Sequence, residues 1–166
     1  MAEKRLVLSD ASPLIGLAAA GGFGLLRGLF GKITVTRTVQ REIAAGKGLP
    51  GASDVAGAIR ARWVRVIKDP APDERLAELD PGEASTLAAA VASKAECLVL
   101  MDDPLGRRHA EELGVAVTGT AGVLLIAKKR RLVRAVRPFF VTLALTSDFR
   151  LSAEVVKAVL AEAGEA

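Results

Sequence analysis

Four acidic residues lie where elements of secondary structure are expected to begin or end: Asp10, Glu42, Glu83 and Asp103. Asp10 and Asp103 each lie two residues after an apolar run that is typical of a buried strand. The carboxyl ends of the strands of an open parallel sheet share one edge, so acids at these ends could converge there. Carboxylate oxygens are the ligands that Mg²⁺ and Mn²⁺ prefer. A converging set of this kind predicts a metal-dependent nuclease.

Three of these acids also have a structural explanation. Asp103 precedes a proline, which is the arrangement typical of a helix N-cap. The sequence 80–83, Asp-Pro-Gly-Glu, fits a capping box in which Glu83 binds the backbone amide of Asp80. Glu42 could be a solvated helical glutamate, although it lies next to the apolar stripe of its helix.

Asp10 is the acid that is hardest to explain by local structure. Ser12 and Pro13 supply the N-cap and the first helical position expected for the next helix, so Asp10 is not needed as a cap. An acid at the end of an apolar strand is expected at the carboxyl edge of the sheet. We therefore favour a functional role for Asp10.

The order of the expected elements determines where these acids lie. Apolar and β-branched runs predict strands at 5–9, 33–35, 63–67, 97–101 and 115–117. Helical patterns predict helices at 12–20, 37–45, 53–62, 81–93 and 104–114. Strands that alternate with helices form parallel βαβ units. We therefore expect a three-layer α/β/α sandwich with a central parallel sheet.

Length and composition indicate one domain. The chain has 166 residues, of which 51% are hydrophobic and 25% charged, so it can form a core and is too apolar to be disordered. After the last expected strand it is predicted to be helical, with breaks near 137–138 and 147–151. We expect a single domain over 1–166, with the C-terminal helical segment 133–166 packed on it.

The other residues argue against alternative chemistry. One cysteine and one histidine, Cys97 and His109, cannot form a zinc cage. His109 lies in a helical segment with no evident nucleophile nearby, so a Ser/His/Asp or Cys/His mechanism has little support, and no glycine-rich nucleotide motif is complete. Cys97 has no partner for an internal disulfide, so a reducing cytoplasm is the expected location. No run of 18 apolar residues suggests a membrane span, and Asp10 and Pro13 interrupt what would be the centre of a secretory signal.

Taken together, these residues resemble the acidic set of the PIN-domain ribonucleases. The resemblance covers nearly the whole chain and is closest to a branch of PIN-like proteins related to toxin–antitoxin ribonucleases. The segments that carry it are Asp10 within 8–15, Glu42 on the following helix, Glu83 within 79–84, Asp102-Asp103 with Arg107, Ala110 and Gly114 beyond them, and the stretch 118–125.

The resemblance implies a PIN-like fold that binds one or two Mg²⁺ or Mn²⁺ ions and hydrolyses RNA phosphodiester bonds. The catalytic residues that it implies are Asp10, Glu42, Glu83 and Asp103, and the metal ligands are Asp10, Glu83, Asp103 and Asp102. The chain departs from the family pattern at two positions, since Glu83 stands where aspartate is commoner and Met101 where many members have Thr or Ser. Side chains alternate along a strand, so one acid of 102–103 is expected to face the site, and we favour Asp103.

Five residues are candidates for contacts with the RNA: Ser12, Arg107, Arg108, Thr118 and Thr120. Arg107 and Arg108 lie one helical turn beyond Asp103, where they could bind a phosphate. Thr118 and Thr120 could instead hydrogen-bond the acids or cap the following helix. The basic run 128–131 could bind an RNA backbone or complement a helix C-terminus. Lys and Arg outnumber Asp and Glu by 23 to 19, which permits binding to a polyanion without requiring it.

Many PIN relatives are the toxins of toxin–antitoxin pairs, which implies a small antitoxin as a protein partner. Two alternatives stay open. One is a catalytically weak PIN-like module that binds nucleic acid or protein, and the other is a structural subunit that uses the apolar region 17–30 as an interface. The same region would allow a homodimer, although burial within the monomer would explain it equally well.

Overall fold

The sheet at the centre of the structure has five strands, and all neighbouring strands run parallel. The computed structural model describes residues 5–146 and 151–166. The strand order is β3-β2-β1-β4-β5. The bounds of the strands are β1 (Leu6–Ser9), β2 (Ile33–Thr36), β3 (Val64–Ile67), β4 (Cys97–Leu100) and β5 (Ala116–Thr118). The prediction of a central parallel sheet is confirmed.

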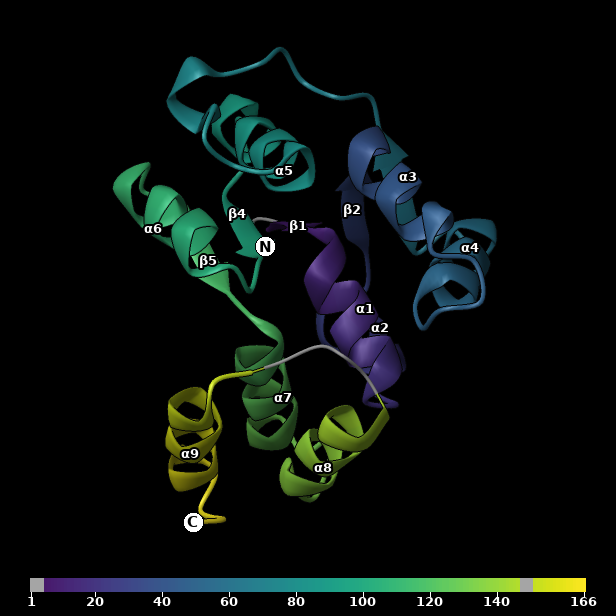
Figure 1. Ribbon diagram of the computed structural model, residues 1–166, viewed down its shortest axis with the longest axis vertical. Helices are drawn as coiled ribbons and strands as arrows, with labels where there is room; N and C mark the ends of the chain where they lie inside the picture. The colour runs from purple at the N-terminus through teal and green to yellow at the C-terminus, as the bar shows by residue number, and fades with distance from the viewer. Residues whose placement is uncertain (1–4, 147–150) are drawn as a thin grey trace.

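Helices connect the strands and cover both faces of the sheet (Figure 1). Their bounds are α1 (Ala11–Ala19), α2 (Gly24–Phe30), α3 (Arg37–Ala45), α4 (Ala52–Arg60), α5 (Pro81–Ala92), α6 (Pro104–Glu112), α7 (Thr120–Lys129), α8 (Arg137–Thr146) and α9 (Ala153–Glu162), with a 3₁₀ turn η1 (Glu74–Leu76) before α5. This arrangement is the predicted three-layer α/β/α sandwich.

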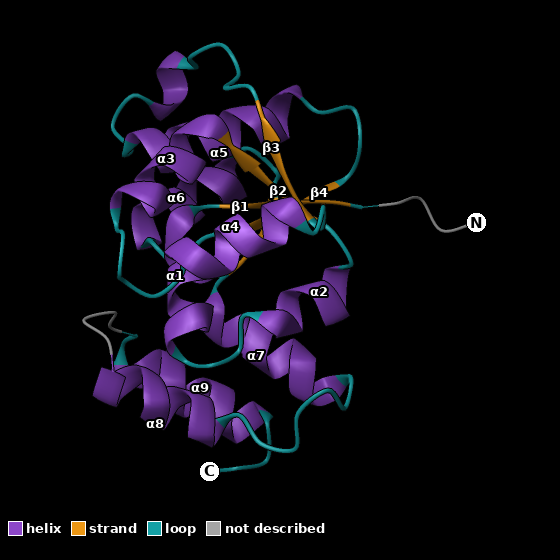
Figure 2. Cartoon of the chain, turned by 90° about the vertical axis from the view of Figure 1, so that its right-hand side faces the viewer, coloured by secondary structure: helices purple, strands orange, loops and turns teal. Residues whose placement is uncertain are grey.

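Side chains alternate across the sheet and form two cores. Leu98 and Leu100 of β4 pack into the larger core with α1, α2, α4 and α7, whereas Val99 packs into a smaller core with α5 and α6. Figure 2 shows the strands enclosed by helices, with α7, α8 and α9 together at one end of the molecule. There α9 lies against α7, and α8 lies against α1.

The first helix begins earlier than predicted. It starts at Ala11, so Asp10 takes the N-cap position and Ser12 is the second helical residue. The backbone of Asp10 is still extended, with φ −73° and ψ 170°, and the chain turns into the helix directly after it. Pro13 is tolerated because it lies within the first turn, where a backbone amide has no partner in the helix. The prediction that Ser12 caps this helix is therefore wrong.

The apolar region 17–30 lies in the core of the monomer. Leu17 and Leu26 are fully buried, and the ring of Phe23 packs on Trp63 with 5.2 Å between the ring centroids. Burial explains the composition of this region, so it gives no support to a homodimer or a structural subunit. In the parts of the chain that the structure describes, no single helix is long and apolar enough to cross a membrane, and α1 and α2 pass that test only as a pair bent by 120°. Most of the predicted break near 147–151 lies outside the described residues.

Candidate active site

The carboxyl ends of β1, β4 and β5 meet at one edge of the sheet. The register pairs Ser9 with Leu100 and Leu100 with Thr118. The amide of Asp10 donates a hydrogen bond of 3.0 Å to the Leu100 carbonyl, and the amide of Met101 donates one of 2.8 Å to the Thr118 carbonyl. The residues that follow these three strands are thereby brought side by side, in the place where parallel sheets form binding crevices.

Asp10 is deeply buried at this edge, since the residue is only 4% exposed. Burial raises the pKa of Asp10 to about 6, against a hydrogen bond with the Ala11 amide that lowers it. The negative charges of Glu42, Asp102 and Asp80 raise it further. Its side chain makes no hydrogen bond that caps α1. The ionised carboxylate therefore destabilises the fold, which is typical of a residue that has a function.

The N-terminus of α5 contributes Glu83 and Asp80. Burial raises the pKa of Glu83 to about 7, and the charges of Asp103, Asp10 and Asp80 add to this effect. A hydrogen bond with the Asp80 amide lowers it, and this bond is one half of the predicted capping box. The other half is missing, because the Asp80 side chain makes no capping hydrogen bond. The acids whose charges act on one another here are called the acidic edge, and they are Asp10, Glu42, Asp80, Glu83, Asp102 and Asp103. Asp80 was not predicted as a member because its sequence pattern is that of a helix cap.

Glu42 reaches the same place from α3, which packs against α5. Its carboxylate lies against the backbone of Gly82, where a Cβ atom would come within 2.5 Å of Glu42 Oε2. Partial burial raises the pKa of Glu42, a hydrogen bond with the Gly82 amide lowers it, and the charge of Asp80 raises it. The residue as a whole is exposed, so Glu42 forms the outer rim of the acidic edge.

Asp102 and Asp103 lie in the same place but have different partners. Asp103 caps α6, since its Oδ2 accepts a hydrogen bond of 2.9 Å from the Gly106 amide, and its charge also raises the pKa of Glu83. Asp102 accepts two hydrogen bonds of 2.8 Å from Thr120, one from the amide and one from the hydroxyl. Burial nevertheless raises the pKa of Asp102, against these bonds and the charge of Arg107. Both acids therefore belong to the edge, Asp102 beside Asp10 and Asp103 beside Glu83.

The edge thus gathers carboxylates from two strand ends and two helices. A family model described as a PIN domain matches residues 6–165 of the chain. The chain belongs to the PIN-domain family. This match confirms the family that the acidic residues resemble. PIN domains are generally nucleases and typically use divalent metals. No curated protein sequence matches this PIN domain.

The chemistry of the donor set of this PIN domain fits a hard divalent cation. Every candidate ligand is a carboxylate, and the softer ligands lie elsewhere: Cys97 begins β4 at the opposite edge of the sheet, and His109 pairs with Glu78. In residues 5–146 and 151–166 no three acidic, histidine or cysteine side chains stand close enough to hold an ion together. Mg²⁺ commonly binds through one or two carboxylates and keeps several waters, so such spacing suits an ion held partly through water.

The residues expected to contact RNA fall into three groups. The Thr120 hydroxyl is buried and donates to Asp102, so its observed contact is with an acid. Ser12 and Thr118 are half-buried near the ends of β1 and β5. Arg107 and Arg108 line a cleft beside Asp102. Arg107 and Arg108 are therefore the cations of the predicted set that lie next to the acidic edge.

The basic run 128–131 begins in the last turn of α7, and both of its lysines contact the C-terminus of the chain. Lys128 pairs with Glu165 at 2.9 Å, and Lys129 pairs with Glu162 at 3.2 Å. Arg130 donates to the Leu29 carbonyl at 3.2 Å. These contacts favour the structural explanation of this run over a role in binding an RNA backbone.

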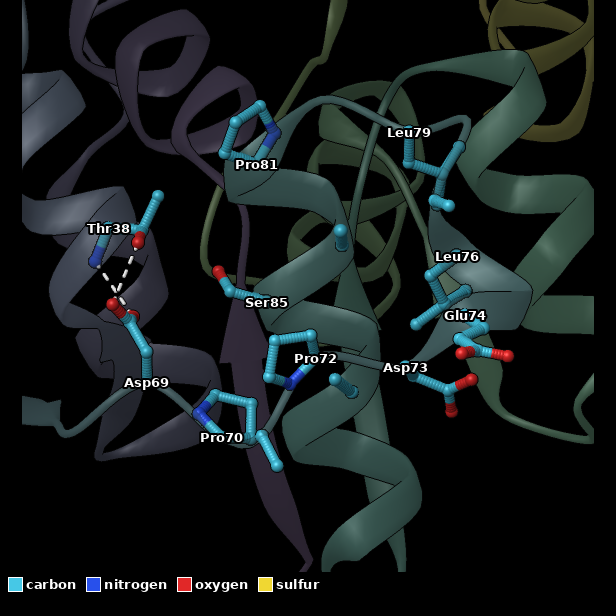
Figure 3. A pocket seen from close by; sticks show the side chains of 14 residues that line it. Thr38, Asp69, Pro70, Pro72, Asp73, Glu74, Leu76, Leu79, Pro81 and Ser85 are labelled. Atoms are coloured by element: carbon cyan, nitrogen blue, oxygen red, sulfur yellow. Dashed lines mark hydrogen bonds between the residues drawn. The ribbon is translucent and has the colours of Figure 1, made fainter.

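A cavity of about 480 Å³ lies on the other side of α5 and is mainly apolar (Figure 3). Leu76, Leu79 and several prolines line it, and most of its polar side chains are already engaged. Thr38 donates two hydrogen bonds to Asp69, as Figure 3 shows, the Ser85 hydroxyl bonds to Thr36, and Asp73 pairs with Arg75. The cavity therefore adds little polar chemistry to that of the edge.

Proposed function

We propose that this PIN domain is a ribonuclease that hydrolyses RNA phosphodiester bonds with Mg²⁺ or Mn²⁺. The observation that carries the proposal is the convergence of acids at the carboxyl edge of the sheet, where they raise one another's pKa values. Mutually repelling carboxylates are costly to a fold unless a cation neutralises them. Support for RNA in particular comes from the family resemblance, and the arginines beside the edge support a nucleic-acid backbone in general.

In the proposed mechanism the acids hold a divalent ion and the surrounding groups hold the acids. A bound Mg²⁺ would neutralise charge on the scissile phosphate and make a bound water more acidic. Asp10, Glu83 and Asp103, with Asp102, are the proposed ligands, directly or through water. Thr120 fixes both oxygens of Asp102, and the Gly82 amide orients Glu42 at the rim. These contacts keep the carboxylates aimed at one place before the substrate arrives.

The biological setting is part of the same proposal. The resemblance to toxin–antitoxin ribonucleases supports a toxin that acts on cytoplasmic RNA and is neutralised by a small antitoxin protein. A second candidate is a PIN-like module with weak catalysis, which would keep the scaffold and the acidic edge without efficient cleavage. The two candidates differ in whether the purified chain turns over RNA.

The test is cleavage of end-labelled single-stranded RNA by the purified protein, with DNA of the same sequence alongside. We expect RNA cleavage in Mg²⁺ or Mn²⁺ that stops in EDTA and resumes when excess metal is added back, and a loss of at least about 100-fold in kcat for Asp10→Asn. Asp54→Asn, an exposed acid in the first turn of α4, is the matched control and should keep full activity. Cleavage that survives in Asp10→Asn would refute the proposed role of this residue, and no metal-dependent cleavage by the wild type would favour the weakly catalytic module.

A further inference from the structure

A second cavity, of about 510 Å³, opens directly beside the acidic edge. α6, the junction between β5 and α7, and α9 form its walls. We propose that this cleft is a subsite for one nucleotide of the RNA next to the scissile phosphate, in which α9 contacts the base and Arg108 contacts the backbone phosphate. The inference rests on the proposed ribonuclease function and adds to it the part of the protein that selects the RNA.

The cleft is continuous with the site because Asp102 belongs to both. Gly119 is in its lining, and a Cβ atom there would lie 2.5 Å from Asp102 Oδ1 and 3.0 Å from Arg107 Nη1. A side chain at position 119 would therefore collide with the acid and the arginine. The volume lies within the range of about 300–1,000 Å³ that is usual for small-ligand pockets, which suits one nucleotide.

The part of the lining that comes from α9 is apolar. Val155 and Val159 line the cleft on this helix. Val159 packs partly against the main core, whereas Val155 is 40% exposed and is not part of it. An exposed valine in the lining of a cleft offers an apolar surface to the face of a base, and a larger purine face buries more of that surface than a pyrimidine face does.

Charge distinguishes this cleft from the cavity on the other side of α5. Arg107 lies beside Asp102 and is partly neutralised by it, while Arg108 is exposed and makes no salt bridge within the described part of the chain. Glu111, one turn further along α6, also lines the cleft, but no ion pair joins it to Arg108 among the described residues. Arg108 is therefore the cation of the lining that is available to a phosphate. The cavity beside α5 has no lysine or arginine in its lining, so it offers no cation to an RNA backbone. The RNA is therefore expected to leave the acidic edge over Asp102.

The test compares two cleft variants, Arg108→Ala and Val155→Glu, with two matched controls. Arg60→Ala removes an exposed arginine from α4, and Val141→Glu changes an exposed valine of α8 that lies outside the cleft. Cleavage of single-stranded RNA in Mg²⁺ is measured at several salt concentrations. We expect both cleft variants to raise KM about tenfold with little change in kcat, as for loss of one base or phosphate contact. Arg108→Ala should also reduce the salt dependence of log kcat/KM by about 0.7, as for one phosphate contact to a single strand.

A second measurement reports on base selection. Sequencing of the ends produced from a random RNA pool should show that Val155→Glu changes the base preference at one position near the cleaved bond, whereas Val141→Glu leaves it unchanged. Thermal unfolding of all variants identifies any loss of fold. If the wild type cleaves RNA and the cleft variants behave like their controls, the subsite proposal alone is overturned. If the wild type does not cleave RNA, the proposed function is overturned and the subsite with it.

Discussion

Replacement of Asp10 by asparagine is expected to stabilise the metal-free protein at neutral pH. The fold raises the pKa of Asp10 from 3.8 to about 6, chiefly because the residue is buried. A rise of about 2 pKa units corresponds to about 3 kcal/mol of unfavourable free energy when the carboxylate is ionised. The asparagine loses the charge but also weakens the bond to the Ala11 amide, so about 3 kcal/mol is an upper value. For a domain of this length, that would raise the Tm by up to about 10 °C.

The pH dependence gives the sign of the effect independently. The folded protein binds the Asp10 proton more tightly than the unfolded chain, so between pH 3.8 and about 6 the free energy of unfolding falls as pH rises. Above about pH 6 the full penalty is present, and below pH 3.8 the carboxyl is protonated in both states and the penalty is gone. The advantage of Asp10→Asn should therefore be greatest near pH 7.5 and should disappear near pH 4.

The assay is urea and thermal unfolding in EDTA at these two pH values. Asp54→Asn controls for the loss of one negative charge and should change stability little. Glu165→Gln should have the opposite sign, because hydrogen bonds from the Val136 amide and from Lys128 lower the pKa of Glu165 to about 2 and so stabilise its charged form. Mn²⁺ should raise the Tm of the wild type more than that of Asp10→Asn. The reasoning is refuted if Asp10→Asn is no more stable than the wild type at neutral pH. It is also refuted if the gain in stability is the same at both pH values.

Three further substitutions probe the groups that hold the acids. Gly82→Ala places a Cβ atom 2.5 Å from Glu42 Oε2, and the flexible end of Glu42 can move away from it. The free energy of unfolding should therefore change by less than about 1 kcal/mol, while kcat/KM falls as far as in Glu42→Gln. Unchanged cleavage would contradict this. Gly119→Ala meets the Asp102 carboxylate, which Thr120 holds with two hydrogen bonds, so it should cost about 1–3 kcal/mol in urea unfolding and reduce activity as well. Thr120→Val removes the hydroxyl donor and raises the pKa of Asp102 further; the expected loss of about 1–2 kcal/mol should shrink as pH falls, and an equal loss at acid pH would argue against it.

Local sequence rules predicted the strands and most of the helices because these elements are short and strongly patterned. The helix Arg37–Ala45 is found with the bounds expected, since Thr36 caps it and a glycine follows it. The start of α1 was predicted wrongly for a physical reason. Ser12-Pro13 has the pattern of a cap, but the chain leaves β1 and turns at Asp10, and the requirement to follow the sheet prevails over the local signal.

The site was predictable as far as sheet topology determines it. Asp10 and Asp103 follow strands, so a parallel sheet places them at one edge. Asp80 was missed because an acid before a proline is expected to cap a helix, and only the structure shows that its side chain does not. The packing of α3 on α5 and of α9 beside α6 depends on contacts distant in sequence, so neither the position of Glu42 nor the apolar wall at Val155 could be predicted.

The acidic edge is built against the N-termini of three helices. Asp10, Asp80 and Asp103 take the N-cap positions of α1, α5 and α6, and each helix N-terminus carries a partial charge of about +0.5 that favours a carboxylate. The pKa values of Asp10 and Glu83 are nevertheless raised, so burial and mutual repulsion outweigh the three dipoles. The negative charge left uncompensated is what a divalent cation would neutralise. Affinity for the metal and instability of the metal-free fold therefore have the same origin. A substitution that relieves the repulsion should weaken metal binding and stabilise the metal-free fold. Acids that served only as caps would behave in the opposite way, because their removal destabilises a helix and leaves metal binding unchanged.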